Sequence, residues 1–93
     1  MTGAELAEAW AGTNGVAFDG RVVEVFGFSD TERYHLREVE VEVAEPDRKD
    51  RRAVKIGRGR GGVMFNVDAS DWPAMEAVLQ RLSEAKSSLA AGS

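Results

Sequence analysis

The sequence contains no cysteine and a single histidine, His35. Without cysteine, a disulfide framework, a thiolate nucleophile and a zinc–thiolate site are all excluded. One histidine is also too few for a metal centre built from several imidazoles. We therefore expect no metal ligand and no cofactor.

Long apolar runs are missing as well. No stretch approaches the ~20 apolar residues that a membrane-spanning helix needs. The first residues, MTGAE, lack the basic start and the apolar run of a signal peptide. The sequence therefore predicts a protein without a transmembrane segment, and a cytoplasmic location is the default.

The chain is also short, and its 93 residues suffice for one domain, residues 1–93. A domain of this size buries about 60–65% of the surface of its unfolded chain. A deep catalytic cavity that excludes water is hard to build from so little chain. We therefore expect a non-enzymatic binding module without catalytic residues.

Two patterns resemble catalytic motifs, and each has a structural explanation. Residues 57–62, GRGRGG, match the G-x-G-x-x-G pattern of dinucleotide sites, but a strand follows them where such a site needs a helix. They therefore predict a glycine-rich hairpin turn. His35 lies near Ser29 and Asp30 without the strained turn that presents a nucleophile, which favours a surface histidine.

The start of the chain predicts a short helix followed by a hairpin. Over residues 2–11, Thr2 and Glu5 have the spacing of a capping box, and three apolar residues fall on one helical face: Leu6, Ala9 and Trp10. Residues 16–18 and 21–26 predict two strands joined by a two-residue turn at Asp19 and Gly20, where both residues need positive φ. The uncharged strand 16–18 offers an edge for a partner peptide or a second copy.

Residues 27–33 are polar and are predicted to be irregular, and residues 34–36 resume an extended stretch. The chain then alternates apolar and acidic residues. Val39, Val41 and Val43 would face the core, and the intervening acids would form a solvated face: Glu38, Glu40 and Glu42. Carboxylates two residues apart on a strand are ~6.5–7 Å apart, which suits solvent better than a metal cage.

We expect this strand to form a hairpin with the strand over residues 52–57. If the numbers of facing residues sum to 97, the apolar residues that point into the core from one strand lie opposite those of the other. Val43 then faces Val54, Val41 faces Ile56, and Glu42 faces Lys55. The same register leaves Glu38 and Glu40 without a facing cation. We therefore expect the charges to be neutralised in part, with a positive hairpin tip beside an acidic face.

A C-terminal helix is predicted over residues 70–88. Ser70 or Asp71 caps it, Pro73 suits its first turn, and one apolar stripe runs along it: Trp72, Met75, Val78, Leu79, Leu82 and Leu89. We expect this stripe to pack on the inward residues Val39, Val41, Val54, Ile56 and Phe65. The prediction is an α+β domain: an N-terminal helix and linker (1–13), an antiparallel, strongly bent sheet of five to six strands (14–68), and one closing helix (70–88).

This order of elements resembles the bacterial pleckstrin-homology-like (PH-like) domains, in particular the small actinobacterial type. The resemblance spans about residues 14–86 and rests on the hairpin AFDGRVV (17–23) and the helix start SDW (70–72). It implies a bent seven-stranded sheet closed by the helix, and a scaffold for protein or peptide contacts, often self-associating, without catalysis. The long basic loop that binds phosphoinositides in the family is here the two-residue turn at Asp19 and Gly20.

Basic residues are concentrated in one segment. Between residues 48 and 60 the chain has one acid, Asp50, and seven basic residues that are the candidate ligand-binding set: Arg48, Lys49, Arg51, Arg52, Lys55, Arg58 and Arg60. Such a cluster either pairs with the acids of the same sheet or binds an anion. No aromatic residue interleaves residues 47–62 and the whole chain carries a net charge of −4, which disfavours nucleic acid.

These observations favour an interaction module for a protein, a peptide or a second copy, which contacts its partner through a sheet edge and charged faces. The alternative is an anionic-ligand binder, for a lipid headgroup or nucleic acid, through the basic segment 48–60.

Overall fold

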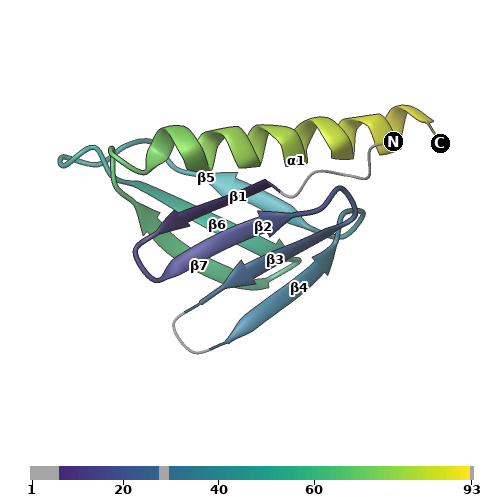
Figure 1. Cartoon of the computed structure of the whole chain (residues 1–93), viewed down its shortest axis with the longest axis horizontal. Helices are drawn as coiled ribbons and strands as arrows, with labels where there is room; N and C mark the ends of the chain where they lie inside the picture. The colour runs from purple at the N-terminus through teal and green to yellow at the C-terminus, as the bar shows by residue number, and fades with distance from the viewer. Residues whose placement is uncertain (1–6, 28–29, 93) are drawn as a thin grey trace.

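The computed structural model describes residues 7–27 and 30–92, which form seven strands and one long helix (Figure 1). The elements are β1 (Ala7–Ala11), β2 (Asn14–Phe18), β3 (Val22–Phe26), β4 (Thr31–His35), β5 (Glu40–Val43), β6 (Arg52–Arg58), β7 (Gly61–Val67) and α1 (Trp72–Gly92).

The strands form two antiparallel sheets. One has the order β1-β2-β3-β4 and the other the order β5-β6-β7. Helix α1 runs along the side of the molecule where β1 and β5 lie (Figure 1). The predicted α+β class with an antiparallel sheet and a C-terminal helix is confirmed. The expected single sheet of five to six strands is replaced by two sheets of four and three strands.

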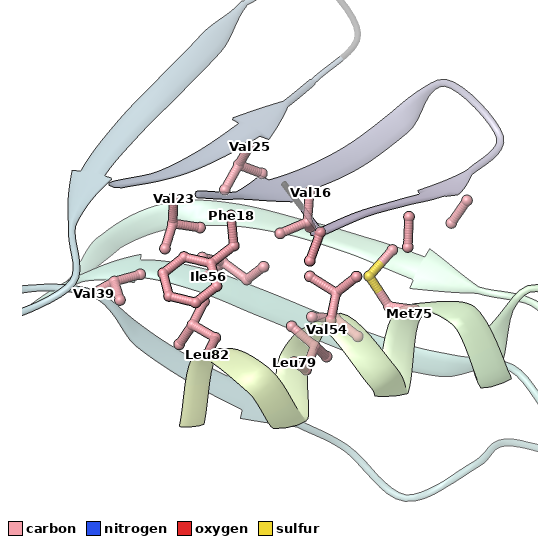
Figure 2. Packing of buried hydrophobic residues seen from close by; sticks show 14 of the residues in the cluster. Val16, Phe18, Val23, Val25, Val39, Val54, Ile56, Met75, Leu79 and Leu82 are labelled. Atoms are coloured by element: carbon pink, nitrogen blue, oxygen red, sulfur yellow. The ribbon is translucent and has the colours of Figure 1, made fainter. Parts of the chain in front are cut away.

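The core fills the space between the sheets and the helix (Figure 2). Met75, Leu79 and Leu82 of α1 join Val54 and Ile56 of β6 in one buried cluster. The remaining members of the predicted helix–sheet contact belong to the same cluster, fully or partly buried: Val39, Val41, Phe65, Trp72 and Val78. The predicted packing of the helix stripe on the sheet is therefore confirmed.

The predicted N-terminal helix is wrong over the described residues, because residues 7–11 form strand β1. Ala7, Ala9 and Ala11 are buried and the intervening Glu8 and Trp10 are exposed, which is the period of a strand. The small alanine side chains let α1 lie close to the buried face of β1, and the good helix propensity of alanine concealed the alternation. Residues 1–6, with Thr2 and Glu5 of the predicted capping box, lie outside the described residues.

The predicted hairpin forms between β2 and β3, but its turn differs. Phe18 faces Val23, so four residues lie between this pair, and among Asp19 and Gly20 the positive φ is confined to Gly20. The Asp19 carboxylate accepts hydrogen bonds from the backbone N–H groups of Arg21 (2.9 Å) and Val22 (2.8 Å). Because these bonds hold the turn, Asp19 acts as an Asx cap and does not occupy a central turn position.

Two strands in this sheet also differ from expectation. Strand β2 pairs with both β1 and β3, so the expected free edge at residues 16–18 is wrong. Residues 31–33, predicted to be irregular, belong to β4, which a turn over residues 36–38 separates from β5.

The register of β5 with β6 is the predicted one. Val43 lies opposite Val54, and Glu42 lies opposite Lys55. The expectation that Val43 points into the core is wrong, since the residue is 43% exposed although Val54 is fully buried. The core thus covers one end of β5 and leaves the other end open.

Candidate functional site

The seven basic residues of segment 48–60 are distributed along the whole of β6 and both of its flanking turns. Arg48, Lys49 and Arg51 lie in the loop between β5 and β6, whereas Arg58 and Arg60 lie at the turn between β6 and β7. Seven strand residues span ~20 Å, so these two groups are at opposite ends of the strand. Arg52 and Lys55 lie along β6 between them.

The loop between β5 and β6 is held by Asp47. Its Oδ1 accepts hydrogen bonds from the backbone N–H groups of Arg51 (2.9 Å) and Lys49 (2.8 Å), which lower the pKa of the carboxyl group. The Arg51 guanidinium also pairs with Asp47 Oδ2 at 3.1 Å. One of the three cations at this tip is therefore neutralised locally.

At the other end of the hairpin, carboxylates of the acidic face accept hydrogen bonds from the turn between β6 and β7. Glu38 Oε2 accepts a hydrogen bond from Arg58 at 2.7 Å, and Glu40 Oε1 accepts one from the Gly59 backbone N–H at 3.2 Å. The expectation that Glu38 lacks a cation is therefore wrong, because the Arg58 side chain reaches beyond the last paired residues of β5. Gly57, opposite Glu40, has no side chain to block the path of Glu40 to Gly59.

The glycine-rich motif forms a hairpin turn between β6 and β7, as predicted. Gly57 and Gly62 face each other, and a Cβ at Gly57 would lie 2.1 Å from the Gly61 carbonyl oxygen. The glycines thus allow two backbones to approach closely. His35 is exposed, and its Nδ1 accepts a hydrogen bond from the Arg37 backbone N–H at 3.2 Å. Ser29 lies outside the described residues.

A groove of about 780 Å³ runs between β5 and α1, and we call it the β5–α1 groove. Val39, Val41 and Val43 line its sheet side, and Trp72, Leu79 and Leu82 are the larger apolar side chains on its helix side. Arg52 lies over the Trp72 ring, 4.9 Å from the centroid, and fixes the indole at one end of the groove.

On the side of β5 that faces this groove, backbone N–H and C=O groups have no partner strand among the described residues. The Ala44 N–H donates to the Ala53 carbonyl at 2.9 Å, so the even-numbered residues of β5 direct their N–H and C=O groups toward β6. By alternation, the N–H and C=O groups of Val41 and Val43 point the opposite way. Among the described residues, no strand pairs with β5 on that side.

The two ends of the β5–α1 groove differ in charge. At the end where β5 begins, the Lys86 side chain crosses from α1 and donates a hydrogen bond to the Val39 carbonyl. Glu76, one helical turn beyond Trp72, lines the groove on the opposite side of Leu79 from Lys86. Because α1 and β5 run in opposite directions here, the helix places the Lys86 ammonium group near the start of β5 and the Glu76 carboxylate nearer its end.

Sequence reasoning missed this groove because it depends on how far α1 lies from an edge strand. The sequence pattern places the alternating valines of residues 39–43 in the core, and it gives Lys86, within the predicted helix 70–88, no contact with them.

Comparisons with family models, curated proteins and solved structures found no match to this chain. Within residues 7–27 and 30–92, no helix is long and apolar enough to cross a membrane. In the same described residues, no group of three or more acidic or histidine side chains is arranged to hold a metal ion.

Proposed function

We propose that this protein is a non-catalytic binding module that takes an extended peptide into the β5–α1 groove, where the peptide adds a strand to β5. The observation that carries the proposal is the row of outward N–H and C=O groups on Val41 and Val43 beside an apolar groove. Main-chain hydrogen bonds supply affinity in this mode of recognition, and pockets for alternate side chains supply specificity.

The apolar surface of the groove and the acidic residues of β5 determine which peptide sequence binds best. In an added antiparallel strand, side chains opposite Val41 and Val43 enter the apolar groove, whereas those between them lie beside Glu40 and Glu42. Aliphatic residues suit the first positions and lysine or arginine the second. The best ligand is therefore a segment that alternates aliphatic and basic residues.

A second copy of the chain is a poorer occupant of the same edge. Two β5 strands paired about a twofold axis at Val41 would place Glu40 of each strand opposite Glu42 of the other. Like charges directly opposite on neighbouring strands are destabilising. The acidic face of β5 thus favours a basic peptide over self-association through this strand.

The arrangement of elements also supports the proposed relationship to the PH-like domains. Seven strands followed by one C-terminal helix are the number and order of elements that the resemblance implies. The relationship is proposed on this architecture and on the hairpin and helix-start residues 17–23 and 70–72.

The anionic-ligand alternative has less support. Its residues lie at both ends of β6, and two of them are paired with acids, Arg51 with Asp47 and Arg58 with Glu38. Arg48 and Lys49 at the exposed loop remain the candidates for an anion contact.

The test uses a fluorescein-labelled peptide, Gly-Ser-Gly-Val-Lys-Val-Lys-Val, with its C-terminus free or amidated. Val43→Pro removes an outward N–H from the edge without touching the ladder to β6, where proline is tolerated. Val43→Thr is the matched control, because it keeps the N–H and the shape of the side chain.

We expect at least one peptide form to shift the amide resonances of Val41 and Val43, and Val43→Pro to weaken binding about three- to tenfold, with Val43→Thr near wild type. The proposal fails if neither form binds at millimolar concentration, or if both variants bind as the wild type does.

A further inference from the structure

We infer that the β5–α1 groove recognises the C-terminus of its peptide, with the terminal carboxylate held by the ammonium group of Lys86. This inference rests on the proposed peptide binding and adds the direction of the peptide and the group that ends it.

The hydrogen-bonding edge of β5 stops at Val39. The Val39 N–H already donates to the His35 carbonyl at 3.1 Å, so it is not available to a ligand. The Val39 carbonyl points into the groove, where Lys86 Nζ donates to it. From Val41 toward the start of β5, an added strand therefore meets one more backbone acceptor, the Val39 carbonyl, but no further backbone donor.

Consider an antiparallel peptide with one residue opposite Val41. The residue two further along lies opposite Val39, where its N–H can donate to the Val39 carbonyl. Its own carbonyl then lacks a backbone donor on β5, and the nearest donor is the Lys86 ammonium group. A chain that ends at this residue presents a carboxylate to Lys86, and the charge makes this bond stronger than one to a neutral carbonyl.

Lys86 also selects the direction of the peptide. In an antiparallel strand the C-terminus lies at the start of β5, beside Lys86. In a parallel strand it would lie at the end of β5, toward Glu76, and the two carboxylates would repel each other. Charge complementarity along the groove thus favours the antiparallel direction.

The side of the groove next to Lys86 also suits a final aliphatic residue. That residue lies opposite Val39, which is fully buried, and it enters the groove near Leu82, whose side chain is also buried. The inferred ligand therefore ends in an aliphatic residue with a free carboxylate, preceded by a basic residue opposite Glu40.

The experiment compares the free-acid and amidated forms of the same labelled peptide by fluorescence anisotropy. Lys86→Met keeps the apolar stem of the side chain and removes the charge, whereas Lys86→Arg keeps the charge. Lys49→Met makes the same substitution in the loop between β5 and β6. Thermal unfolding of each variant confirms that the fold is retained.

For the wild type, Lys86→Arg and Lys49→Met, we expect the free acid to bind about tenfold more tightly than the amide. Lys86→Met should bind both forms equally. If acid and amide bind the wild type equally, with Val43→Pro weakening both, the C-terminal inference is overturned and strand addition stands. Persistence of the acid preference in Lys86→Met overturns the role of Lys86. If neither form binds the wild type, strand addition itself is wrong, and the inference falls with it.

Discussion

The Trp10 ring lies over Gly15, the residue directly opposite it on β2, so closely that a Cβ on Gly15 would lie 2.6 Å from Trp10 Cε3. Phe26 of β3 faces Gly15 from the other side and stacks on Trp10, with ring centroids 5.2 Å apart. A glycine in the middle of three strands thus lets two aromatic rings meet across it on the outer face of the sheet.

Gly15→Ala is therefore expected to displace the indole. We expect a loss of ~1–3 kcal/mol in unfolding free energy, measured by urea denaturation, because the new methyl group overlaps the ring. In a Trp10→Ala background the same substitution should cost clearly less, since the overlap is gone. An equal cost in both backgrounds would show that the backbone of β2 rejects alanine, independently of Trp10.

The core between α1 and the sheets makes a second prediction. Leu82 is 2% exposed and belongs to the buried cluster, so Leu82→Ala should lower the unfolding free energy by ~2–5 kcal/mol. Leu89, on the same helix, is 37% exposed, and Leu89→Ala should change it by no more than about 0.5 kcal/mol. Similar effects of the two variants would place the helix stripe outside the core.

Acid should weaken the turn between β2 and β3. Hydrogen bonds from the backbone N–H groups of Val22 and Arg21 lower the pKa of Asp19 below its ordinary value. A carboxyl group with a depressed pKa in the folded state stabilises the protein above its unfolded pKa, and this contribution is lost as the pH falls through the folded pKa.

Asp19→Asn removes this titration and is expected to be less stable than the wild type at pH 6, with the difference shrinking below about pH 4. Chemical denaturation at a series of pH values measures it. Asp47 titrates in the same direction in both proteins, so it cancels from the difference. A difference independent of pH down to pH 2 would contradict the assigned role of the Asp19 charge.

Much of the β5–β6 hairpin and of α1 is readable from sequence because their side chains alternate or recur with one period. Val41 and Val43 could be matched to Ile56 and Val54 without any knowledge of the rest of the chain. Strand β1 could not be recognised from the sequence because its buried residues are alanines, which are good helix formers. The β5–α1 groove was hidden because Lys86 and Val39 are 47 residues apart in the chain, and their contact depends on the position of the whole helix.

The last prediction concerns the basic tip between β5 and β6. Arg48 and Lys49 are exposed, whereas Arg51 pairs with Asp47, which also holds the loop through its backbone bonds. Arg48→Glu with Lys49→Glu should leave the unfolding free energy within about 0.5 kcal/mol of the wild type, while Arg51→Glu should lower it further because two carboxylates then face each other.

The same variants separate the two proposed functions. If peptide binding occurs in the β5–α1 groove, the double reversal should leave the affinity for the alternating peptide within about twofold at 150 mM salt, because exposed charges more than ~8 Å away are largely screened. Wild-type protein should also fail to sediment with vesicles containing phosphatidylserine, since the chain carries a net charge of −4 and its cations lie at two ends of β6. Vesicle binding that falls steeply with salt and disappears in the double reversal would instead make the tip the functional surface, and the anionic-ligand alternative would replace the peptide groove.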